Sequence, residues 1–165
     1  PSQIRVTAPQ ERCDFWFSPL AQSGGKYNTE LRRDSQPDDA PVSPDVVLLA
    51  VGGAVQSHYA LCARSIIIDP TPKQMGLYKA LLEAHNTLLN SLVPGAVIGP
   101  LVQAALSKLQ AAAPPGSVLP SDLGHGIGLS IREKHLDLKP DSKRTVEPGM
   151  TFAVVTRIDK IPRLD

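Results

Sequence analysis

The 165-residue sequence is poor in the features that mark several large classes of protein. It has two cysteines, Cys13 and Cys62, in unlike contexts, which excludes a disulfide framework and a thiolate metal site. Lysine plus arginine (17) nearly balance aspartate plus glutamate (16), so charge alone does not argue for nucleic-acid binding. Aromatic residues make up only 4%, and none interleaves with the basic groups at 139–144 and 157–160, which disfavours a single-stranded nucleic-acid site. No apolar run approaches the roughly 20 residues of a membrane-spanning helix, and the N-terminus lacks a signal-peptide pattern.

Two apolar runs predict neighbouring strands in the first half of the chain. Residues 46–51 are all apolar and lie between Pro44-Asp45 and Gly52-Gly53, which is typical of a strand buried on both faces. Residues 66–68 predict a second strand, joined to the first by a long hairpin. Residues 1–45 have loop composition, except that the aromatic residues 15–17 predict a short strand or a packed edge segment.

Two helices are expected after the hairpin. From Pro72 onward, apolar residues recur at i, i+3, i+4 and i+7 until Pro94-Gly95 stops the pattern. A second helix opens around Pro100 and continues to the alanines before Pro114. Strands are then predicted at 127–131 and 150–155. The order of strands, two helices and strands predicts the α+β class.

The run Gly124-His125-Gly126-Ile127-Gly128 differs from the Gly-x-Gly-x-x-Gly of dinucleotide sites, and no strand–turn–helix pattern follows it. We therefore expect these glycines to permit a close backbone approach or a kink within a sheet. His125 is the one residue with ligand chemistry in a motif, but a divalent ion needs several ligands. The other histidines, His58, His85 and His135, are scattered, and no serine lies in a Gly-x-Ser-x-Gly elbow.

Four segments together carry a resemblance to a known fold. They are the decapeptide PLAQSGGKYN at 19–28, Arg64-Ser65 with Asp69-Pro70, the octapeptide GIGLSIRE at 126–133, and Pro-Gly-Met-Thr-Phe at 148–152. The chain resembles the pita-bread fold of methionine aminopeptidase, aminopeptidase P and creatinase. Within that superfamily it is most similar to the N-terminal peptidase-like (M24-like) domain of the large subunits of FACT histone chaperones, chiefly through Gln-Ser-Gly-Gly-x-Tyr-Asn at 22–28.

Active relatives in this superfamily hold two divalent ions with two aspartates, a histidine and two glutamates. The resemblance places the two aspartates at Ala50 and Leu61, the histidine at His125 and the first glutamate at Val155, and the chain stops before the last glutamate. Three apolar replacements remove the charge that offsets the desolvation of a dication. The resemblance therefore implies no bound metal, no cofactor and no catalytic residue. A family histidine that contacts substrate falls at Arg132.

The resemblance implies a catalytically inactive pita-bread domain at 17–165, incomplete at its C-terminal end, and the end of a preceding segment at 1–16. Because the sequence starts with Pro1, we expect a piece of a longer protein. The family implies a nuclear, chromosomal protein that reorganises nucleosomes in transcription, replication and repair. Its partners would be core histones or histone tails, with a small HMG-type subunit bound through other domains. We expect the former substrate cleft to hold a peptide, lined by Arg64, His125, Arg132 and Glu133.

Two alternatives stay open. One is a metallo-aminopeptidase or prolidase with unusual ligands, although the available acids, Asp38, Asp39, Asp45 and Asp69, lie at the wrong spacing. Metal binding with peptide turnover would favour it. The other is a nucleic-acid-associated, inactive relative of the same fold, which a salt-sensitive affinity for RNA would favour.

Overall fold

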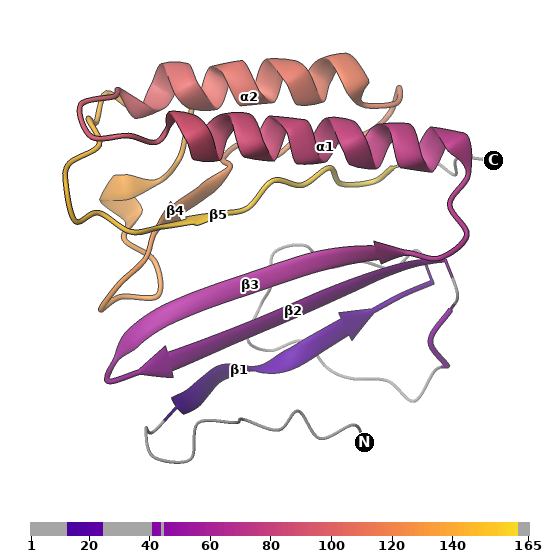
Figure 1. The fold of residues 1–165 in the computed structure, drawn as a ribbon, viewed down its shortest axis with the longest axis horizontal. Helices are drawn as coiled ribbons and strands as arrows, with labels where there is room; N and C mark the ends of the chain where they lie inside the picture. Colours follow the sequence, from indigo (N-terminus) through magenta and orange to yellow (C-terminus); the bar gives the residue numbers. More distant parts are fainter. Residues whose placement is uncertain (1–12, 25–40, 44, 162–165) are drawn as a thin grey trace.

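The structure is a computed structural model that describes residues 13–24, 41–43 and 45–161, with side chains from Pro19 onward. Its elements, in chain order, are β1 (Cys13–Gln22), β2 (Val46–Val55), β3 (His58–Ile67), α1 (Pro72–Ser91), α2 (Ile98–Ala112), β4 (Gly124–Gly126), the 3-10 turn η1 (Lys134–Leu136) and β5 (Phe152–Val154). Figure 1 shows α1 and α2 side by side as one layer, the sheet β1-β2-β3 as another, and β4 with β5 between them at one end. The predicted α+β class is confirmed.

The three-stranded sheet is antiparallel and is built around the predicted hairpin. β2 and β3 pair from Val46↔Ile67 to Val55↔His58, so only two residues turn the chain. Those residues, Gln56 and Ser57, have φ of 48° and 64°, as a tight turn matched to the twist of two strands requires. β1 forms the outer strand on β2, with register shifts near Phe17.

The N-terminal aromatic segment therefore lies in an edge strand, as its composition predicted. The domain start expected at residue 17 falls inside β1, and the pairing of β1 with β2 reaches back to Cys13↔Val55. Much of the loop composition predicted for 1–45 lies outside the described residues.

Two strand predictions are wrong in detail. β2 runs past Gly52-Gly53 to Val55, and Leu49 is 37% exposed, so this strand is not buried on both faces. The strand predicted at 127–131 is absent: the N–H of Ile127 donates to the carbonyl O of Thr151 at 3.0 Å, and residues 128–131 form bends, where Gly128 bonds locally and to the hairpin. The N–H of Gly128 donates to the carbonyl O of Ser130 at 3.1 Å, and the N–H of Tyr59 donates to the carbonyl O of Gly128 at 2.9 Å.

Both predicted helices are present. α1 begins at Pro72 after a capping box, in which the N–H of Gln74 donates to Thr71 Oγ1 (3.2 Å) and the N–H of Thr71 donates to Gln74 Oε1 (2.8 Å). The facing sides of α1 and α2 form the main core with the segments around β4 and β5. Its buried members are Ala84, Leu88, Ile98, Val102, Ala105, Leu109, Leu123, Leu138, Val146 and Ile158.

The outer edge of β3 is the side of the sheet that faces the β4–β5 layer in Figure 1. Backbone groups alternate in direction along a strand, and the N–H of the even-numbered Ile68, next to the end of β3, donates inward to the carbonyl O of Asp45. The odd-numbered residues of β3 therefore direct their backbone groups to the outer edge. The Tyr59 N–H is bonded to Gly128 there, and the Ala63 carbonyl O accepts Nη1 of Arg64 at 2.7 Å. A charged side chain on an edge strand opposes pairing with another chain.

We expect Arg64→Ala to increase self-association, by about twofold or more in the apparent association constant, because it uncovers the Ala63 carbonyl and removes a cation from the edge. Sedimentation velocity over a concentration series measures the effect. Arg144→Ala removes the same charge from an exposed site elsewhere and serves as the control. Equal association of both variants would show that Arg64 does not protect the edge.

Candidate functional site

The first two positions that the resemblance assigns to metal ligands lie together on one face of the hairpin. Ala50 pairs with Ala63, and the neighbouring pair on the same face is Gly52↔Leu61, so Ala50 and Leu61 are diagonal neighbours. Ala50 is 4% exposed and packs with Leu20, Leu61 and Ala63 in a small cluster. Every side chain in this cluster is aliphatic, so it offers no metal donor.

The other two positions lie on the β4–β5 pair. His125 pairs with Ala153, and Val155 follows two residues later on the same face, where its N–H donates to the carbonyl O of Leu123 at 2.9 Å. The half-buried His125 has its Nδ1 3.0 Å from the carbonyl O of Gly126. Phe152 and Val154, which alternate with these residues on β5, pack against the helix core.

The residues at these four positions do not fit the two divalent ions of the active relatives. Only His125 carries a donor atom, whereas hard divalent ions require several carboxylate oxygens. Across the described ranges, no group of three or more His, Cys, Asp or Glu side chains could hold a metal ion.

The glycine run holds β4 close to its neighbours, as predicted. A Cβ on Gly124 would overlap the Ala153 carbonyl of β5, and the φ of Gly124 is +127°. A Cβ on Gly126 would lie 2.7 Å from Cβ of Leu136. These glycines therefore serve backbone packing of β4 against β5 and η1.

Arg132, expected to line a peptide cleft, is bound in an ion-pair network beneath the loop. Its Nε donates to Asp137 Oδ1 at 3.0 Å and its Nη2 lies 3.8 Å from Asp122 Oδ2, while Lys139 Nζ lies 3.1 Å from Asp137 Oδ2. Burial alone would raise the pKa of Asp137, but the hydrogen bonds and charges of Arg132 and Lys139 outweigh it, and the pKa is lowered. The hydrogen bond to Asp137, aided by the charges of both carboxylates, raises the pKa of Arg132 despite its partial burial.

Glu133 lies beside this network, at the end of the glycine-rich loop. Its N–H donates to the carbonyl O of Gly126 at 2.9 Å, which closes the loop, and its Oε2 is 4.0 Å from His135 Nε2. The loop that carries the expected binding residues is therefore held at its base by both backbone and ionic contacts.

Arg64 lies on β3, a different element from those that carry the other three expected binding residues. It follows Ala63 in β3, so its side chain leaves the face opposite the Ala50 cluster. Among the described residues, no hydrogen bond or ion pair joins Arg64 to His125, Arg132 or Glu133.

Arg64 acts instead on His85 of α1, one of the histidines that the sequence leaves scattered. Burial first, and the charge of Arg64 second, lower the pKa of His85. Nδ1 of His85 lies 2.9 Å from Oγ1 of Thr156, a residue 71 positions away. No motif or spacing signals such a pair, because only the tertiary fold brings α1 beside the segment after β5.

Comparison with known proteins decides the family. The sequence matches Metallopeptidase family M24 over residues 5–163. The chain belongs to this family. In the part of the chain that the structure describes, neither α1 nor α2 is both long enough and apolar enough to cross a membrane.

Within the M24 family, the sequence is similar to subunits of the FACT complex. It is 33% identical over 156 residues to FACT complex subunit SPT16 of Oryza sativa subsp. japonica, covering 93% of this chain and 15% of that protein. It is 28% identical over 163 residues to the Dictyostelium discoideum subunit, covering 98% of this chain and 15% of that protein. The chain thus spans 15% of the length of these relatives. The resemblance to the large FACT subunit is confirmed.

Solved structures support the same grouping. The N-terminal domain of FACT complex subunit SPT16 from Cicer arietinum matches with a TM-score of 0.76 and 32% identity, over 86% of this chain and 34% of that one. A prolidase from Thermococcus sibiricus matches with a TM-score of 0.74 at 19% identity, over 86% of this chain and 38% of that one, which shows the fold alone. The predicted pita-bread fold, present as a partial M24 domain, is confirmed.

Proposed function

We propose that this M24 domain is a non-catalytic peptide-binding part of a FACT-type histone chaperone subunit. The observation that carries the proposal is the match to SPT16 subunits, which extends over 93% of the chain in sequence and is repeated in the Cicer arietinum structure. By that relationship the protein works in the nucleus, on chromatin, in nucleosome reorganisation during transcription, replication and repair. Its partners are core histones or their tails, and a small HMG-type subunit held by other domains.

The loss of peptidase activity follows from side-chain chemistry. Ala50 and Leu61 contribute to an aliphatic cluster. Val155, where the resemblance places a glutamate, brings no carboxylate to the strand face that carries His125. Bringing a dication into such surroundings would cost several kcal/mol or more without compensation. Water activation by a metal pair is therefore not available to this domain.

The proposed peptide site comprises the face of β4–β5 with His125, together with the glycine-rich loop and its Glu133. Arg132 positions this loop through Asp137 and Asp122. Arg64 contributes from β3, where it presents a cation at the sheet edge. A basic histone tail would meet Glu133 as its acidic partner, and the partly buried Leu20 and Leu61 at the margin of the aliphatic cluster would contact apolar side chains.

The first test is calorimetric titration of the metal-stripped chain with Mn²⁺, Co²⁺ and Zn²⁺, followed by an assay with proline-containing dipeptides. We expect no saturable heat and no turnover, and an active prolidase run in parallel supplies the positive control. Saturable binding of any ion together with dipeptide hydrolysis would make the chain a metallopeptidase with unusual ligands.

The second part of the test is titration of labelled histone-tail peptides and of RNA. We expect the tail to bind and Glu133→Gln to weaken it about tenfold, because a charge pair contributes roughly 1.5 kcal/mol or more. Glu147→Gln removes an exposed carboxylate elsewhere and is the matched control. Salt-sensitive affinity for RNA, with no affinity for histone tails, would favour the nucleic-acid-associated relative.

A further inference from the structure

His85 is a half-buried histidine that joins α1 to a segment far away in the chain. Its Nδ1 lies 2.9 Å from Oγ1 of Thr156, in the segment after β5 that runs beneath α1 in Figure 1. The residues two positions before and after Thr156, Val154 and Ile158, pack in or against the main core. The hydrogen bond therefore lies between two apolar anchors and fixes this segment against the helix.

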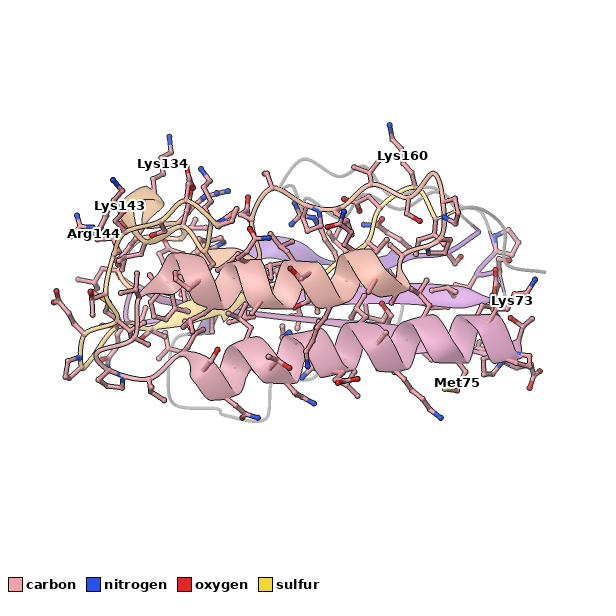
Figure 2. The ribbon with its side chains drawn as sticks, turned by 90° about the horizontal axis from the view of Figure 1, so that it is seen from above. Lys73, Met75, Lys134, Lys143, Arg144 and Lys160 are labelled. Carbon is pink, nitrogen blue, oxygen red and sulfur yellow. The ribbon has the colours of Figure 1, made fainter. Side chains whose placement is uncertain are left out.

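The helical layer brings no carboxylate to His85. The residues one turn away on the same face of the helix are all leucines, namely Leu81, Leu82, Leu88 and Leu89. Glu83, two positions before His85, is directed to Lys108 of α2, with Oε1 3.3 Å from Nζ. Figure 2 shows Lys73 at one end of α1, away from the middle of the helix.

Other charged neighbours come from β3 and from the segment after β5. Arg64 of β3 brings a positive charge that, second to burial, lowers the pKa of His85. Arg157 has its Nε 3.5 Å from Oδ2 of Asp159, so these two charges offset each other. Figure 2 shows Lys160 directed away from α1. Among the described residues, no ion pair joins His85 to a carboxylate, so a proton on its ring would add an uncompensated charge.

We propose that the His85–Thr156 contact is a pH-sensitive latch, which holds the segment after β5 on α1 while the ring is neutral and releases it when the ring takes up a proton. The neutral ring and the hydroxyl can each donate or accept, so the hydrogen bond forms with either tautomer. Proton uptake from solvent places a charge on a half-buried ring beside Arg64. The charged ring is better solvated when it turns outward, and Thr156 then loses its partner.

The direction of the pH effect follows from linkage. The pKa of His85 in the folded chain lies below its ordinary value of 6.5, so the unfolded chain binds the proton first as pH falls. The latch contributes its full stabilisation above that value and loses it below, until the folded ring is also protonated. At about pH 5.5 the loss is at most about tenfold in the unfolding equilibrium constant, because protonation favours the unfolded chain by that factor one unit below its pKa.

The test compares urea unfolding of the full chain with that of His85→Gln, in which an amide can still bond to Thr156 but does not titrate. From about pH 8 to about pH 5.5, we expect the unfolding constant of wild type to rise about two- to tenfold more than that of His85→Gln. His58→Gln, which removes an exposed histidine of β3, is the matched control and should follow wild type.

Hydrogen exchange tests whether the contact holds the segment. Thr156→Val removes the hydrogen bond and keeps the shape of the side chain. After correction for the intrinsic exchange rate, amide exchange at 155–158 should be faster than in wild type at neutral pH in this variant. In wild type the same amides should become faster only at about pH 5.5.

Three results would overturn the proposal. Equal pH dependence of wild type and His85→Gln would show that the ring does not titrate as a latch. Exchange at 155–158 that is unchanged in Thr156→Val would show that the hydrogen bond does not hold the segment. NMR titration of the His85 ring uses the wild-type chain alone, so a pKa at or above 6.5 would overturn the proposal even where His85→Gln fails to fold.

Discussion

Gly124→Ala is expected to destabilise the domain by about 3 kcal/mol or more. Two costs combine at this position. The φ of +127° lies in a region that L-residues rarely adopt, and the added Cβ would overlap the Ala153 carbonyl of β5. Because the overlap is with backbone, relief requires β4 and β5 to separate.

Two other glycines separate these costs. Gly149 has a φ of +88° but open space around its Cβ position, so Gly149→Ala should cost about 1 kcal/mol from backbone strain alone. Gly76 lies inside α1 with nothing within 4 Å of its Cβ position, so Gly76→Ala should stabilise the domain by about 0.5–1 kcal/mol. Urea unfolding of the three variants measures the series. A Gly124→Ala variant no less stable than Gly149→Ala would show that β4 and β5 are not held as closely as described.

Asp137→Asn is expected to cost about 2 kcal/mol at pH 7, because it leaves Arg132 and Lys139 without their shared, buried carboxylate. Asp137 is 9% exposed and accepts from Arg132 Nε at 3.0 Å, with Lys139 Nζ at 3.1 Å. Loss of this carboxylate should loosen the base of the glycine-rich loop, so amide exchange at 126–133 should quicken along with the fall in stability.

The effect of Asp137 depends on pH in a defined direction. The pKa of Asp137 in the folded chain lies below its ordinary value of 3.8, so its stabilisation is fully present above that value. It is lost as pH falls through the lower, folded pKa, where the unfolded chain already binds the proton. The difference in unfolding free energy between wild type and Asp137→Asn should therefore shrink below about pH 4.

Asp141→Asn provides the control for this pH series. Asp141 is exposed and has no ion pair among the described residues, so its replacement should change stability by less than about 0.5 kcal/mol. Unfolding free energies measured between neutral pH and about pH 2 test both variants. A constant difference between wild type and Asp137→Asn across this range would show that the ion-pair network does not contribute through the charge of Asp137.

Elements with a strong local pattern were predictable from the sequence. The apolar stripe after Pro72 and the stop at Pro94-Gly95 place α1 correctly, because helical periodicity and terminator residues act within a few positions. Residues 127–131 were misassigned because alternating apolar residues predict a strand only when a partner strand is available. In the fold, Gly128 bonds to Tyr59 and Ser130 instead.

The site was predictable only in part. The family resemblance assigned Ala50 and Leu61 to one site, and the two-residue hairpin turn makes them diagonal neighbours. How Arg64 and Glu133 are presented was not predictable. Strand alternation directs Arg64 to the opposite face from Ala50, whereas Glu133 depends on how the loop closes against Gly126.

The sequence by itself determined the family and the order of the elements, because these depend on residue identity and short-range pattern. Only the tertiary structure decided which charges are paired. Arg132 is bound to Asp137 and Asp122, while Lys143 and Arg144 have no ion-pair partner among the described residues. Ion pairing depends on distances of a few ångströms between segments far apart in the chain, and such distances exist only once the core has packed.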